Sequence, residues 1–177
     1  MGPQERLWLA IGRYFTDEED SVGLDVGLGN LASTDLDILW RRLSSGAAPI
    51  DPSRTAWDQL HDVEVPLLEL LALGVETAAA RCSSLLVPLE GVTVDDVRLP
   101  YLGFFLYSDE ITFHWWSDGG WSPVTVAALA DLVGELIALA PGAVQTAEHA
   151  GFGEDFWRAV NEYLAAVRRR DSPGRDR

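Results

Sequence analysis

The chain has 177 residues, of which 47% are apolar and 23% are charged, so it is long and apolar enough to bury a core as a single domain. Its 28 acidic residues face 13 basic ones, all of them arginine, and the formal net charge is −15. So negative a chain repels phosphate backbones, so we expect no direct binding of nucleic acid. No apolar stretch approaches the roughly 18–20 residues of a membrane span.

The N-terminal part predicts a β-hairpin over about residues 6–28. Residues 6–15 are rich in strand formers, and residues 22–29 alternate valine or leucine with glycine and aspartate, which is a strand pattern. The acidic turn between them forms the hairpin tip. Glycines in the second strand let another group pack closely against that face.

The middle of the chain predicts mainly helices. Ser33 or Thr34 caps a helix that runs to about residue 45, and a short helix is possible around 56–62. Pro66 then opens a largely buried helix to about residue 82. Residues 85–89 indicate a short strand.

The clearest strand pair covers about residues 101–116. With Asp109 and Glu110 as a two-residue turn, Leu106 would oppose Phe113, although a longer loop would shift this register. One face of the pair is apolar and is expected in the core. The other face is aromatic and carries polar groups.

Two amphipathic helices follow, over about 123–140 and 154–169. Helices and strands do not alternate regularly, which predicts an α+β fold: an antiparallel sheet built from hairpins at about 6–28 and 101–116, with helices packed on one face. We expect a single domain over 1–167 and a charged tail over 168–177.

Catalytic, cofactor and metal signatures are not apparent. His61, His114 and His149 have no partner at metal-ligand spacing. Cys82 follows Arg81, which would favour a thiolate, but it ends an apolar helix, where buried cysteines are common. A lone cysteine and the lack of a signal-peptide pattern predict a reducing, cytoplasmic compartment.

The remaining candidates are an acidic tip and an aromatic cluster. Tryptophan is a favoured anchor in protein interfaces, and half of the aromatic cluster is expected in the core. The side chains predicted to contact a partner are Asp17, Glu18, Glu19, Asp20, His114, Trp116, Asp118 and Trp121.

The stretch LPYLGFFLYSDEITFHWWSDGGWSPVTVAALADLVGELIAL resembles segments of small acidic immunity proteins from bacterial polymorphic toxin systems. It combines a strand pair, a tryptophan-bearing turn and a helix that starts at Ser122–Pro123. The resemblance implies a cytosolic protein that binds and neutralises a toxin domain, and such nuclease toxins are often basic. It assigns no residue roles.

We therefore expect a protein-binding module, an immunity-type inhibitor of a basic partner, that uses no cofactor or metal. Electrostatic steering would speed its association. Two alternatives stay open. One is a subunit of a structural or defence assembly, and the other is a small enzyme or ligand-binding protein with a pocket on the aromatic face near His114.

Overall fold

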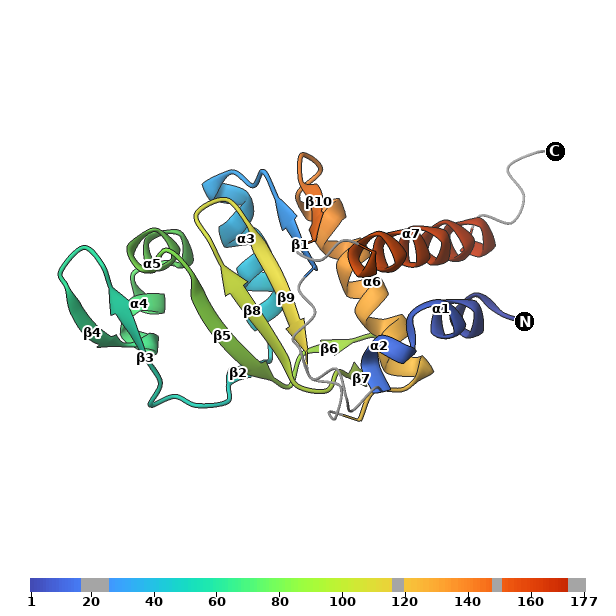
Figure 1. Ribbon diagram of the computed structural model, residues 1–177, viewed down its shortest axis with the longest axis horizontal. Coiled ribbons are helices and arrows are strands. Elements are labelled where there is room, and N and C mark those ends of the chain that lie inside the picture. Colours follow the sequence, from blue (N-terminus) through green and yellow to red (C-terminus); the bar gives the residue numbers. More distant parts are fainter. Residues whose placement is uncertain (17–25, 116–119, 148–150, 172–177) are drawn as a thin grey trace.

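The computed structural model of the protein describes residues 1–16, 26–115, 120–147 and 151–171 (Figure 1). Helices in this part of the chain vary from one turn to about six. They are α1 (Pro3–Ile11), α2 (Arg13–Thr16), α3 (Ser33–Ser44), α4 (Leu67–Ala72), α5 (Val75–Cys82), α6 (Pro123–Leu139) and α7 (Phe152–Asp171).

The described strands are all short. They are β1 (Val26–Gly29), β2 (Ala48–Pro49), β3 (Thr55–Asp58), β4 (Val63–Pro66), β5 (Leu85–Glu90), β6 (Thr93–Val94), β7 (Val97–Arg98), β8 (Leu102–Leu106), β9 (Ile111–Trp115) and β10 (Val144–Ala147). A six-stranded sheet has the order β10-β1-β9-β8-β5-β2, and its pairs are antiparallel. The hairpins β3–β4 and β6–β7 form two small separate sheets. The predicted α+β class is confirmed.

The predicted hairpin over residues 6–28 is wrong in its first half. Residues 3–16 form α1 and α2, because Leu7, Ile11 and Phe15 recur every fourth residue and all three are buried. That spacing outweighs the strand preference of the individual residues. β1 is a strand as predicted, but it lies between β9 and β10.

The hairpin predicted over 101–116 is confirmed as β8–β9, with a different register. Leu106 opposes Ile111, and the amide of Tyr107 donates to the carbonyl of Glu110 at 2.9 Å. Ser108 and Asp109 are therefore the central turn residues. Relative to the prediction the pairing shifts by two residues, which leaves every side chain on its predicted face.

Residues 56–82 differ most from expectation. The possible helix at 56–62 is instead the hairpin β3–β4, and the single helix predicted to residue 82 is divided into α4 and α5. The break falls at Gly74, whose φ of 100° is unfavourable for other residues. Gly74 also caps the N-terminus of α5.

Three predicted helices are confirmed within about two residues as α3, α6 and α7. The residue that caps α3 is Ala32 rather than Ser33 or Thr34, and its amide donates to Asp35. The predicted tail at 168–177 begins as helix, because α7 continues to Asp171, and 172–177 lie outside the described residues. No described helix is long and apolar enough to cross a membrane.

Strand β10 was not predicted. It pairs with β1 at the edge of the sheet, and the indole of Trp157 on α7 donates to the carbonyl of Thr146 at 2.8 Å. A four-residue strand with one exposed valine carries a weak sequence signal. Its neighbours in the fold hold it in place.

The core lies between the inner face of the sheet and the helices, and Figure 1 shows α3 behind strands β8 and β9. An aromatic cluster closes one end of it. Phe15 stacks on Trp115 with ring centroids 4.8 Å apart, and Trp115 also lies 5.6 Å from Phe156 of α7. Segments from both ends of the chain are thus fixed to the central strand β9.

Candidate functional site

Only two of the side chains predicted to contact a partner belong to the described residues. Trp121 is 7% exposed and packs against Phe15 at 4.9 Å, so this indole is a core side chain and not an exposed contact. His114 lies on β9, half-buried. The others lie outside the described residues: Asp17, Glu18, Glu19, Asp20, Trp116 and Asp118.

His114 stands on the outer face of the sheet, which is the face turned away from α3. Its ring meets Phe105 edge-on at 5.6 Å, and Phe105 stacks with Tyr107 at 6.5 Å. All three side chains are half-buried. The predicted aromatic face therefore exists, with its rings partly covered and packed on one another.

Gly27 allows close packing on the same outer face. A Cβ at this position would lie 2.8 Å from Thr146 Oγ1 and 2.9 Å from Glu110 Oε1. The Thr146 hydroxyl donates to the Glu110 carboxylate directly above the strand. Only glycine leaves room for this pair, which explains why a buried strand carries a residue that weakens strands.

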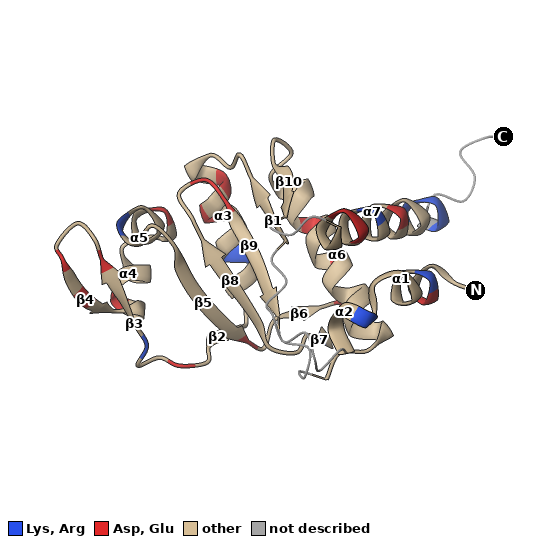
Figure 2. Ribbon diagram, in the orientation of Figure 1, with Lys and Arg blue, Asp and Glu red and all other residues tan. Residues whose placement is uncertain are grey.

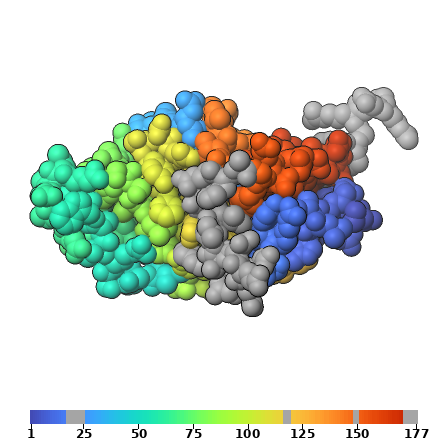
Figure 3. Space-filling model, in the orientation of Figure 1, coloured from blue at the N-terminus to red at the C-terminus, as the bar shows by residue number. Residues whose placement is uncertain are grey.

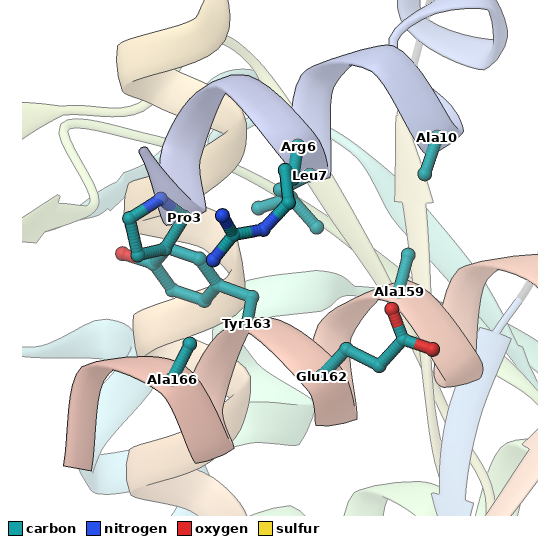
Figure 4. Close-up of a pocket in the computed structure, with 8 residues that line it drawn as sticks. All are labelled: Pro3, Arg6, Leu7, Ala10, Ala159, Glu162, Tyr163 and Ala166. Carbon is teal, nitrogen blue, oxygen red and sulfur yellow. The ribbon is translucent and has the colours of Figure 1, made fainter. Parts of the chain in front are cut away.

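A cavity between α1 and α7 has a volume of about 40 Å³ (Figure 4). Tyr163 and Ala159 of α7 and Leu7 of α1 contribute to its walls. A space of this size holds two or three water molecules and is far below the roughly 300 Å³ of a small-molecule site. It does not provide an active site.

The hairpin β3–β4, called the ribbon here, offers a more accessible surface. Figure 1 shows it at the opposite end of the molecule from α1 and α7. Trp57 opposes Glu64, and Asp58 opposes Val63. Because directly opposed residues share a face, Trp57 and Glu64 lie on one side and Asp58 on the other.

The side carrying Trp57 faces solvent. The Trp57 side chain is 49% exposed, and Leu60 at the ribbon tip is 71% exposed. Glu64, Asp62 and His61 are exposed beside them. These five side chains, called the ribbon surface below, place large apolar groups next to carboxylates, an arrangement that is common in protein interfaces.

The opposite side of the ribbon is anchored by Asp58, which is 0% exposed. Its carboxylate forms an ion pair with Arg81 at the end of α5 and accepts from the amide of Leu60 at 3.0 Å. Nδ1 of His61 lies 2.7 Å from the same carboxylate. The amide of Gln59 donates to the carbonyl of Arg81 at 2.9 Å, so backbone and side chains both join the ribbon to α5.

Electrostatics explain why the Asp58 carboxylate stays charged. The Arg81 guanidinium has the largest effect and lowers the pKa of Asp58, burial opposes this, and the His61 ring and the Leu60 amide lower the pKa further. The pKa of Arg81 is raised in turn, chiefly by its hydrogen bond to Asp58. The pair is fully ionised at neutral pH.

Cys82 directly follows Arg81 but is not an activated nucleophile. Burial raises the pKa of its thiol, the Asp58 carboxylate raises it further, and Arg81 only partly opposes this. The side chain is buried in the core. A neutral, inaccessible thiol fits a packing role.

The chain around the ribbon is acidic. Residues 51–76 contain six carboxylates and one arginine, Arg54; Asp58 is buried and paired with Arg81, and the other five carboxylates are exposed. In the part of the chain that the structure describes, no ion pair involves Asp62, Glu64 or Glu69. Figure 2 shows acidic positions on the ribbon and on α4 beside it. This end of the molecule therefore carries uncompensated negative charge.

Exposed apolar side chains extend the ribbon surface onto α4. Leu68 in α4 and Leu73 immediately after that helix are both about half exposed. The space-filling view shows the ribbon segment at one end of the molecule (Figure 3), and α4 packs against β4. Apolar area and negative charge are thus concentrated in one region.

Comparison with protein-family models, with curated proteins and with solved structures found no match.

The ribbon surface was missed in the sequence, and one local signal could have found it. Trp57 and the alternating pattern of Val63 and Val65 flank a polar turn, as strands of a hairpin do. Asp58 precedes Leu60 by two residues, the spacing of an aspartate that accepts from a turn amide. No local sequence pattern predicts the contact between Asp58 and Arg81.

Proposed function

We propose that the protein is a binding module that captures a basic protein through the ribbon surface and neutralises it, in the manner of an immunity-type inhibitor. One observation carries this proposal. The exposed indole of Trp57 stands among carboxylates that form no ion pair with any described residue, on a hairpin fixed to the body by a buried ion pair.

Charge selects the class of partner. Five exposed carboxylates against one arginine in residues 51–76 attract a cationic surface and repel another acidic one, since the sixth carboxylate, Asp58, is buried and paired with Arg81. Such steering acts mainly on the association rate. Because exposed charges are screened beyond about 8 Å at physiological salt, association should slow as the salt concentration rises.

Apolar contact would supply most of the affinity. Trp57 and Leu60 are each about half exposed or more, so a partner can remove a large apolar area from water at this end of the molecule. Interface tryptophans are frequent hot spots, and their truncation to alanine costs about 2 kcal/mol or more.

The anchored ribbon would reduce the entropic cost of binding. Asp58 is held by Arg81, His61 and the Leu60 amide, so the backbone that carries Trp57 is ordered before a partner arrives. A preorganised surface loses less conformational freedom on association, which increases affinity without any additional contact.

Co-expression with the product of the adjacent reading frame tests the proposal. If that product is a growth inhibitor, the native protein should restore growth and co-purify with it. Trp57→Ala should weaken both effects, and a loss of about 2 kcal/mol corresponds to roughly 30-fold in affinity.

Leu9→Ala is the matched control, because Leu9 is 72% exposed but lies on α1 at the other end of the molecule. It should leave growth rescue and co-purification unchanged. Equal losses for Trp57→Ala and Leu9→Ala, or none for either, would contradict the proposed role of the ribbon surface.

A further inference from the structure

We propose that Trp57 and Glu64 form a subsite for one cationic side chain of the partner, preferably an arginine. The inference rests on the proposed function and adds to it the chemical group that is recognised. The guanidinium would stack on the indole while the Glu64 carboxylate pairs with it from the opposite strand.

The register of the ribbon brings the two groups together. Trp57 and Glu64 are directly opposed on β3 and β4, so their Cβ atoms stand about 4.5–5.5 Å apart on one face. Both side chains are exposed. A flat cation can therefore contact the ring and the carboxylate at the same time.

The chemistry of the pair favours arginine. Tryptophan has the strongest cation–π interaction of the aromatic residues, and a planar guanidinium can stack on the ring while its N–H groups donate to a carboxylate. A lysine ammonium makes the same contacts less completely, because it is compact and strongly hydrated.

Arginines of the chain itself do not occupy this position among the described residues. Arg81 is engaged by Asp58 on the other side of the ribbon. Arg54, which precedes β3, is half-buried, and its charge acts on Asp51 and Tyr101. The subsite is thus open to a cation from another molecule.

Binding of two peptides to the isolated protein tests the inference without the natural partner. Calorimetric titrations would compare an oligo-arginine peptide with an oligo-lysine peptide of equal length. The native protein should bind the arginine peptide more tightly. Trp57→Leu, which keeps apolar bulk but removes the ring, should weaken arginine binding by about 2- to 5-fold and abolish the preference.

Glu64→Gln and Glu69→Gln form a matched pair, since both remove one exposed carboxylate near the ribbon. Glu64→Gln should weaken arginine binding by about 2- to 5-fold, and Glu69→Gln by less than about 2-fold. The Trp57→Leu, Glu64→Gln double variant should lose less than the product of the single effects, because the two groups share one cation.

Several outcomes would overturn the subsite. They are no binding of either peptide, an equal loss for Glu64→Gln and Glu69→Gln, or an arginine preference that survives Trp57→Leu. The proposed function fails separately, if growth rescue in the co-expression test is indifferent to Trp57→Ala. The peptide titrations and the growth-rescue experiment therefore test the subsite and the proposed function separately, and one can fail while the other succeeds.

Discussion

Asp58 and Arg81 are 23 residues apart in the chain and form an ion pair whose carboxylate is inaccessible to solvent. The pair joins a two-stranded ribbon, which lies outside the main sheet, to the end of α5. An isolated two-stranded hairpin is at best marginally stable in water. Its order therefore depends on this contact and on the apolar side chains packed beneath it.

Replacing Asp58 by alanine should loosen the ribbon. The change leaves the Arg81 guanidinium without its carboxylate and the Leu60 amide without its acceptor, and broken buried pairs are strongly destabilising. We expect faster hydrogen exchange of the Gln59 and Leu60 amides and a thermal midpoint lower by several degrees. Glu69→Ala, an exposed change on α4, should alter neither measurement.

The same carboxylate should make stability depend on acid pH. Because Arg81 lowers the pKa of Asp58 in the folded state, the unfolded chain takes up the proton first as pH falls. The stabilisation is complete above about pH 5 and declines below about pH 4. Urea unfolding should show that the native protein exceeds Asp58→Asn in free energy of unfolding, and that this excess shrinks as the pH falls below about 4. An excess of the same size at neutral and at acid pH would contradict this account.

Asp131 should show the opposite dependence. Burial raises its pKa, the hydrogen bond from Tyr163 opposes this, and the nearby charges of Asp95 and Glu135 raise it further. The charged form therefore costs stability at neutral pH, and this cost disappears as the group is protonated. Asp131→Asn retains an acceptor for the Tyr163 hydroxyl, so it should stabilise the protein at neutral pH and have no advantage at acid pH.

The Asp131→Asn experiment is a pair of thermal unfolding curves. A gain of about 1 kcal/mol would raise the midpoint by about 2–4 °C in a chain of this length. A lower midpoint at neutral pH would show that the charge on Asp131 is needed for the hydrogen bond to Tyr163.

Gly27 is expected to tolerate no side chain. Alanine would place Cβ 2.7 Å from the carbonyl oxygen of Ile111 and against the Thr146–Glu110 pair. Overpacking of this kind costs about 1–3 kcal/mol, which a denaturant titration would measure. Gly142→Ala is the control, because no atom lies within 4 Å of its added Cβ. Equal effects at the two positions would be inconsistent with the close packing over β1.

Much of the fold could be predicted because its elements have strong local periodicity. The stripe on α7 and the alternation on β8 and β9 each bury one face, and a register error of two residues left Phe104 and Phe113 facing the core. Helix α6 differs from its predicted one-sided stripe, because it is buried on nearly all sides. The strand predicted for the N-terminal segment was wrong because residues 6–15 contain strand-forming residue types at helical spacing. In such a segment, the packing of Leu7 and Ile11 decides the outcome.

The candidate site could be predicted far less well. Trp121 was predicted to contact a partner, but its indole is a core side chain, and Trp116 lies outside the described residues. Trp57 was not predicted as a contact, because its hairpin depends on the ion pair between Asp58 and Arg81 and on the apolar side chains packed beneath it. Contacts between distant segments leave no periodic signal in a single sequence, so the most exposed indole of the described chain was missed.

Hydrogen exchange of the complex with the product of the adjacent reading frame tests the central claim most directly. Backbone amides that the partner covers exchange more slowly than in the free protein. We predict slower exchange over β3, β4 and the turn between them, with α1 and α7 unchanged. Protection confined to β8 and β9, or to α1 and α7, with none in the ribbon, would contradict capture through the ribbon surface.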